Sequence, residues 1–125
     1  MSYTIFVIDD EKTTRDMLAE YIESLGYNTR LFADGQSAAE EAMDHPPDVA
    51  IIDLNLPDIT GIKLLKILRD QQSNLPCIMI TGDLSHDPMI EAMKAGAFDF
   101  LHKPLNLEQL KLLLEKIVRE MRDRI

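Results

Sequence analysis

Residues 49–57 of this chain read VAIIDLNLP, an apolar, β-branched run that ends at an acid, Asp53. Such a short apolar run predicts a strand that is covered on both faces, as in a parallel sheet. Similar runs occur at residues 4–8 (TIFVI) and 77–80 (CIMI), with weaker ones at 27–32 and 99–102. The sequence therefore predicts five strands.

The segments between these strands have apolar residues at helical spacing, at residues 13–25, 37–43, 61–68, 88–95 and from 106 onward. Glycines are predicted to end two of the helices, at Gly26 and Gly96. Ser37 with Glu40 predicts a capping box, and Asp87 before Pro88 predicts a helix start. The alternation of strands and helices predicts one α/β domain over residues 1–125, with a parallel sheet covered on both faces.

Composition narrows the classes of function. The net charge of -9, from 13 basic and 22 acidic residues, disfavours binding to a nucleic-acid backbone. The single cysteine forms no internal disulfide, which favours a reducing cytoplasm. No apolar run is long enough to span a membrane, and the acidic N-terminal stretch is unlike a secretory signal.

Charged and polar side chains follow the predicted strands, at the points where the strands end. In a parallel sheet the carboxyl ends of the strands meet at one edge, where ligands bind. We therefore expect these residues to lie close together: Asp9, Asp10 and Glu11 after the first strand, Asp53 after the third, Thr81 and Asp83 after the fourth, and Lys103 after the fifth.

Clustered carboxylates need a positive charge nearby. Two of them about 4 Å apart repel by roughly 4 kcal/mol at an effective dielectric near 20. Mg²⁺ is a hard cation that prefers oxygen ligands, and Lys103 adds a compact charge suited to a phosphoryl oxygen. An aspartate can itself accept a phosphoryl group, so the set predicts phosphoryl transfer to an aspartate.

The sequence resembles the receiver domains of bacterial two-component response regulators over nearly its whole length. The motifs that carry the resemblance are IDDE at 8–11, DLNLP at 53–57 with Gly61, ITG at 80–82 and AGAFDFLHKP at 95–104. The resemblance implies a flavodoxin-like three-layer sandwich with strand order 2-1-3-4-5. It also implies a signalling phosphoacceptor that promotes its own phosphorylation and dephosphorylation and is not a conventional enzyme.

The resemblance implies a role for each acid. Asp53 accepts the phosphoryl group from a sensor histidine kinase or a phosphotransfer protein. Asp10 and Asp53 bind Mg²⁺ directly, Asp9 binds it through water, and Asn55 binds it through its backbone carbonyl.

The remaining roles also follow from the resemblance. Lys103, beside a cis bond to Pro104, binds a phosphoryl oxygen, and Thr81 turns its hydroxyl onto the phosphoryl group. Phe100 then moves inward and alters the surface formed by the helix at 88–95, the strand at 99–102 and the last helix. Asn55 and Asp83 flank the attacking water and tune the lifetime of the phosphoryl group.

Three alternatives remain to be weighed. A magnesium-dependent phosphatase of the haloacid-dehalogenase kind needs a second acid two residues after its nucleophile, where this chain has Asn55. A nucleotide or flavin carrier needs a loop that binds phosphate after a strand. The acids at residues 9–11 would instead repel a phosphate group. A degenerate receiver that acts only as a protein-interaction module is disfavoured by the complete set of site residues.

The last helix has no stop signal of the kind that Gly26 and Gly96 provide. Apolar residues continue along one stripe from Leu107 to Met121, beyond the roughly 13 residues that cross one face of a small sheet. This pattern predicts that the chain is the N-terminal receiver of a longer regulator with an output domain. A homodimer through the last two helices and the last strand is a further expectation.

Overall fold

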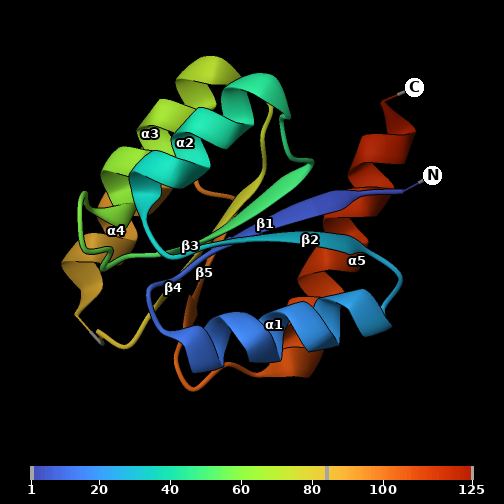
Figure 1. Cartoon of the computed structure of the whole chain (residues 1–125), viewed down its shortest axis with the longest axis horizontal. Coiled ribbons are helices and arrows are strands. Elements are labelled where there is room, and N and C mark those ends of the chain that lie inside the picture. Colours follow the sequence, from blue (N-terminus) through green and yellow to red (C-terminus); the bar gives the residue numbers. More distant parts are fainter. Residues whose placement is uncertain (1, 84, 125) are drawn as a thin grey trace.

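The computed structural model describes residues 2–83 and 85–124, which form a five-stranded parallel sheet between two layers of helices (Figure 1). The strand order is β2-β1-β3-β4-β5, as the resemblance implied. The strands are β1 (Thr4–Ile8), β2 (Asn28–Phe32), β3 (Val49–Asp53), β4 (Cys77–Thr81) and β5 (Asp99–His102). The helices are α1 (Lys12–Ser24), α2 (Gly35–Asp44), α3 (Gly61–Gln71), α4 (His86–Lys94) and α5 (Leu107–Asp123).

The central strands are buried along their whole length. Every residue of β3 and of β4 is buried, whereas the edge strand β2 is partly exposed. β3 pairs in parallel with β1 on one side and with β4 on the other. The acid that ends the apolar run is therefore at the middle of the sheet edge.

Two separate apolar clusters lie on the two faces of the sheet. α2, α3 and α4 cover one face, around buried side chains that include Phe6, Ile52 and Leu65 (Figure 1). α1 and α5 cover the other face, around a cluster that includes Ile51 and Leu114. Neighbouring residues of a strand thus point into different clusters, as the alternation of side chains along a strand requires.

Two of the predicted helix starts are wrong by two to three residues. α2 is capped by Asp34, whose side chain accepts a hydrogen bond from the Ser37 amide at 2.8 Å, so Ser37 is inside the helix. α4 begins after Ser85, so Asp87 lies in the first turn, where an acidic side chain interacts favourably with the helix dipole. Asp34 and Ser85 both belong to residue types that commonly cap helices.

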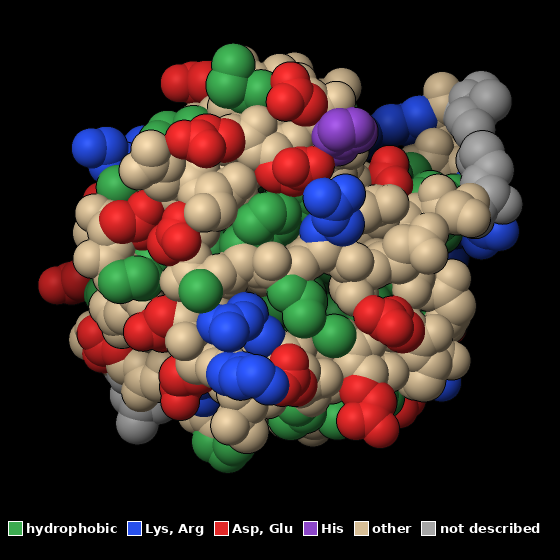
Figure 2. All heavy atoms as spheres, viewed as in Figure 1, with side chains coloured by type: hydrophobic (Ala, Val, Ile, Leu, Met, Phe, Trp, Pro, Cys, Tyr) green, Lys and Arg blue, Asp and Glu red, His purple; other side chains and the backbone are tan. Residues whose placement is uncertain are grey.

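Acidic side chains are scattered over most of the face in view, with fewer basic ones among them (Figure 2). Within the described residues, no helix combines the length and the apolar character needed to cross a bilayer.

Candidate functional site

The structure brings the side chains of Asp9, Asp10, Asp53 and Lys103 together at the carboxyl edge of the sheet. Asp9 and Asp10 follow β1, Asp53 ends β3 and Lys103 follows β5. Carboxylate oxygens of the three aspartates all lie within 4.8 Å of one another. The convergence that the parallel sheet predicted is therefore present.

Lys103 is the cation of this cluster. Its Nζ lies 3.0 Å from Asp53 Oδ2, 3.0 Å from Asp9 Oδ2 and 2.9 Å from Glu11 Oε1. Burial alone lowers the pKa of Lys103, but its carboxylate partners outweigh burial and raise the pKa above the usual value. The ammonium group is therefore charged at neutral pH.

Sequence reasoning assigned no role to Glu11, yet its carboxylate is one of the three partners of Lys103. The side chain is largely exposed, so the pair gains little from burial and acts to orient the ammonium group. The only signal in the sequence was its place directly after two acids at a strand end.

Asp9 is the most deeply buried acid of the cluster, with no exposed surface. Its Oδ1 accepts a hydrogen bond from the Glu11 amide at 2.9 Å. Its Oδ2 lies close to Lys103 but is not aligned for a hydrogen bond with it, and no other partner is present among the described residues. Burial raises the pKa of Asp9, and the nearby Asp53 carboxylate adds to the rise.

Asp53 is held by both of its oxygens. Oδ1 accepts a hydrogen bond from the Asn55 amide at 3.1 Å, and Oδ2 pairs with Lys103. The carboxylate is buried, but it opens onto the same space as the exposed Asp10. The backbone at the next residue is fixed by a hydrogen bond from the Leu54 amide to the Ile80 carbonyl, at 2.9 Å.

The three aspartates fit a divalent cation. Carboxylate oxygens are the ligands that Mg²⁺ prefers, and the buried Oδ2 of Asp9, which accepts no hydrogen bond from the described residues, is an acceptor that a cation would satisfy. One lysine cannot balance the acids that surround it. The side chain of Asn55 is exposed, so a role for this residue depends on its backbone.

Thr81 and Asp83 lie at the end of β4, on the same edge. The Thr81 side chain is fully buried, and its Oγ1 accepts a hydrogen bond from the Asp83 amide at 3.0 Å. Asp83 is exposed, and the hydrogen bond from the Ser85 amide lowers the pKa of its carboxyl. Phe100 on β5 is buried in the cluster beneath α3 and α4, beside the ring of His102.

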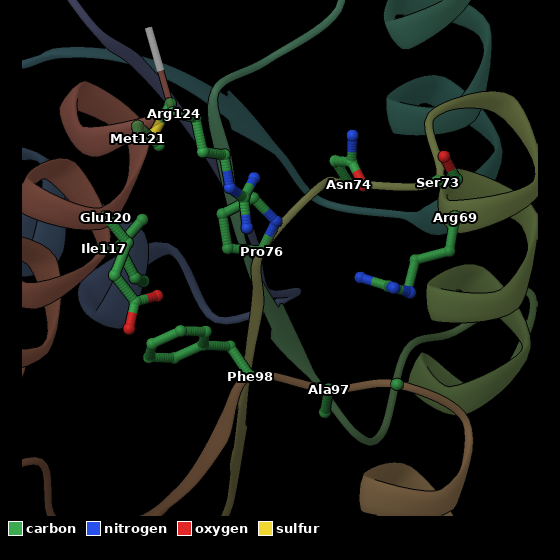
Figure 3. Close-up of a pocket in the computed structure, with 11 residues that line it drawn as sticks. Arg69, Ser73, Asn74, Pro76, Ala97, Phe98, Ile117, Glu120, Met121 and Arg124 are labelled. Atoms are coloured by element: carbon green, nitrogen blue, oxygen red, sulfur yellow. The ribbon is translucent and has the colours of Figure 1, made fainter.

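A pocket of about 330 Å³ lies at the opposite edge of the sheet and contains none of these residues. Figure 3 shows Arg69 and Ser73 on one side of this pocket, Glu120 of α5 on the other, and Phe98 below Glu120. Pro76 and Phe98 precede β4 and β5, so this pocket is at the amino ends of the strands. The candidate site is the acidic edge, where the charged groups converge.

The sheet order and the acidic edge define a flavodoxin-like domain with a candidate metal site, and comparison with known proteins identifies the family. A model of the response regulator receiver domain matches residues 5–115, so this chain belongs to the receiver domains of two-component response regulators.

Individual relatives agree with this assignment. The chain is 35% identical over 116 residues to the transcriptional regulatory protein FixJ of Bradyrhizobium diazoefficiens, covering 93% of this chain and 57% of that protein. It is 32% identical over 115 residues to the regulatory protein AtoC of Escherichia coli, covering 92% of this chain and 25% of that protein. The crystal structure of the NtrX receiver domain from Brucella abortus matches with a TM-score of 0.87 and 32% identity, covering 92% of this chain and 98% of that chain.

Membership of this family has direct consequences. Receiver domains are regulatory and are not conventional enzymes, they generally bind Mg²⁺, and they work with a histidine kinase and an output domain. The chain spans 57% of the length of FixJ and 25% of that of AtoC.

Proposed function

We propose that this chain accepts a phosphoryl group on Asp53 from a histidine kinase or phosphotransfer protein, in a reaction that requires Mg²⁺. The observation that carries the proposal is that the carboxylate of Asp53 lies 3.0 Å from the ammonium group of Lys103 and also belongs to the cluster with Asp9 and Asp10. An acceptor in this position is in contact with a cation and with side chains that can hold a metal.

Each group in the site has a task in this reaction. A carboxylate oxygen of Asp53 attacks phosphorus, and the bond between phosphorus and the leaving group breaks on the opposite side. Lys103 neutralises charge on a phosphoryl oxygen, and Thr81 donates its hydroxyl to another. Asp10, Asp53, the backbone carbonyl of Asn55 and, through water, Asp9 would hold Mg²⁺, which neutralises the charge on the phosphoryl oxygens.

The other candidate functions receive less support. A phosphatase of the haloacid-dehalogenase kind needs an acid where Asn55 stands, and an amide does not act as a general acid or base. A degenerate receiver would lack part of the acceptor, lysine or metal-binding set, whereas all of these groups converge here.

We propose that phosphorylation is read out through α4, β5 and α5. The Lys103 amide donates a hydrogen bond to the Thr81 carbonyl at 2.7 Å, so the ends of β4 and β5 move together. Phe100 already lies inward, with 8% of its surface exposed, so the proposed switch stabilises this position of the ring. Ile90 and Met93 expose apolar surface on α4, which suits a homodimer or another protein partner.

We also propose that this receiver acts within a longer regulator and controls an output domain. The support comes from FixJ and AtoC, which are regulatory proteins that extend well beyond the matched segment. Because FixJ is named a transcriptional regulatory protein, we propose that the output domain acts in transcription.

The function is tested by incubating the chain with acetyl phosphate and Mg²⁺. We expect one phosphoryl group per chain, seen by intact mass spectrometry, and none when EDTA replaces Mg²⁺. A chain that stays unmodified with acetyl phosphate and with a panel of phosphorylated kinases would contradict the proposal and favour the interaction module.

Mg²⁺ is expected to stabilise the fold. At about 100 times its dissociation constant, it should raise the free energy of unfolding by about 2.7 kcal/mol. The raised pKa of Asp9 also indicates that a cation would stabilise the fold, because a carboxyl group with a raised pKa lowers stability at neutral pH. This loss of stability disappears as the pH falls through the raised pKa. Asp10→Asn should abolish the response to Mg²⁺ and stabilise the metal-free chain.

Thermal unfolding with Mg²⁺ and with EDTA measures both effects. Asp44→Asn, at an exposed position on α2, is the control and should respond to Mg²⁺ as the wild type does. An Asp10→Asn chain that melts below the wild type without metal would contradict the electrostatic argument.

The lifetime of the phosphoryl group should depend on Asp83, which is exposed beside Thr81 and leaves room for water. Replacing it by leucine should exclude that water and slow hydrolysis about tenfold, equal to about 1.4 kcal/mol in the barrier. The loss of label after removal of the donor measures the rate, with Asp87→Leu on α4 as the control. An unchanged rate for Asp83→Leu and for substitutions of Asn55 would refute this role.

A further inference from the structure

Asp58 lies in the loop between β3 and α3, yet it binds the first turn of another helix. Its Oδ1 accepts a hydrogen bond from the Gly35 amide at 2.9 Å, and its Oδ2 accepts one from the Gln36 amide at 2.8 Å. The first amides of a helix have no partner within the helix, so this carboxylate satisfies two of them. The loop after Asp53 is thereby tied to α2.

The neighbouring Ile59 adds an apolar contact to the same helix start. A Cβ built on Gly35 would lie 2.6 Å from Ile59 Cγ1, so only glycine lets the loop approach this closely. Ile59 also packs against the buried cluster beneath α2 and α3. Two consecutive side chains therefore hold this part of the loop on α2.

The same loop contains the backbone of Asn55. Asn55 and Thr60 pair as an isolated antiparallel bridge, so residues 55–60 form a closed turn with Asp58 near its far end. The base of the turn is fixed by the hydrogen bond from the Gly61 amide to the Leu54 carbonyl, at 2.8 Å. With its base and far end both held, the turn has little freedom to reorient the carbonyl of Asn55.

We infer that Asp58 is a positioning residue for metal binding: by holding the turn at residues 55–60 on α2, it sets the Asn55 carbonyl for Mg²⁺. The inference rests on the proposed function, in which that carbonyl is a metal ligand. Groups that orient a metal ligand commonly change metal affinity by about 10- to 100-fold when they are removed. Asp58 is outside the cluster of Asp9, Asp10 and Asp53, and both of its oxygens are bound to α2, so its effect on phosphorylation should follow from metal affinity.

α2 carries a matched control. Asp34 caps the same helix through the Ser37 amide, but it lies before α2 and has no hydrogen bond to the turn at residues 55–60. Asp34→Ala and Asp58→Ala both remove carboxylate acceptors from the start of α2, and only the second also releases the turn. A difference in Mg²⁺ affinity between them reports on the turn.

The experiment is an isothermal titration of the wild type, Asp58→Ala, Asp58→Asn and Asp34→Ala with Mg²⁺. We expect Asp58→Ala to raise the dissociation constant about tenfold, Asp34→Ala to leave it at the wild-type value, and Asp58→Asn, which keeps one acceptor oxygen, to lie between. Labelling by acetyl phosphate should slow in Asp58→Ala at low Mg²⁺ and recover at saturating Mg²⁺.

Wild-type affinity in Asp58→Ala, or an equal loss in Asp34→Ala, would overturn the inference and leave the proposed function intact. A wild-type chain that binds no Mg²⁺ would instead refute the proposed function itself, and the inference with it. If Asp58→Ala does not fold, Asp58→Asn decides by the same comparison with Asp34→Ala.

Discussion

Asp53→Asn is expected to eliminate phosphorylation by acetyl phosphate, whereas the wild-type chain should accept one phosphoryl group. The amide that replaces the carboxylate is not a nucleophile, and it gives up the ion pair with Lys103. Asp9 is a poor substitute because its side chain has no exposed surface, whereas that of Asp53 lies beside the exposed Asp10. Intact mass spectrometry after a fixed incubation measures the result.

Asp44→Asn serves again as the matched control, because it removes one carboxylate from an exposed position away from the site. It should be labelled as fully as the wild type. If Asp53→Asn were labelled to the same extent, another residue would be the acceptor and the assignment of Asp53 would be wrong.

The largest loss of stability is expected from Gly61→Ala, at the first position of α3. The added Cβ would lie 2.3 Å from the Asp53 carbonyl oxygen and 2.7 Å from Leu54 Cα. These are backbone atoms and cannot rotate away, so the strand end or the helix must shift. We expect a loss of about 3 kcal/mol in the free energy of unfolding, the upper end of the usual cost of overpacking.

Gly82→Ala is the control for this substitution. Gly82 also lies at the carboxyl edge of the sheet, but a Cβ there would have no atom within 4 Å. Urea unfolding followed by circular dichroism should show a large shift for Gly61→Ala and a small one for Gly82→Ala. Equal stability of the two variants would mean that the backbone at Asp53 yields without cost.

The layout of the fold could be predicted from the sequence because its strands are continuous apolar runs and its helices are amphipathic. The starts of α2 and α4 were harder to predict, because residues 34 to 37 and 85 to 87 each contain two residues of types that commonly cap helices. Which of them caps the helix depends on how the preceding loop leaves the sheet. Strand order came from the resemblance, because alternation alone is compatible with several orders.

The acids and the lysine of the site could be predicted because parallel strands place their carboxyl ends together. The sequence placed Glu11 at the same edge as Lys103 but did not reveal that the two would pair, and it gave no sign of the contact between Asp58 and α2. Glu11 reaches Lys103 across 92 residues of sequence, and Asp58 reaches Gly35 across 23. Such pairings depend on how loops lie over the sheet, and a surface acid in a loop has no local pattern that reveals its partner.

Among residues 2–83 and 85–124, the two apolar clusters on opposite faces of the sheet share no side chain. The side chains of the two clusters are separated by the strands that they share, so a change of volume in one cluster is absorbed mainly by the helices on its own face. The layer of α1 and α5 can therefore be repacked with less effect on α2, α3 and α4 than on itself. The proposed readout surface takes α4 from one layer and α5 from the other, so adapting it to a new partner requires changes in both layers.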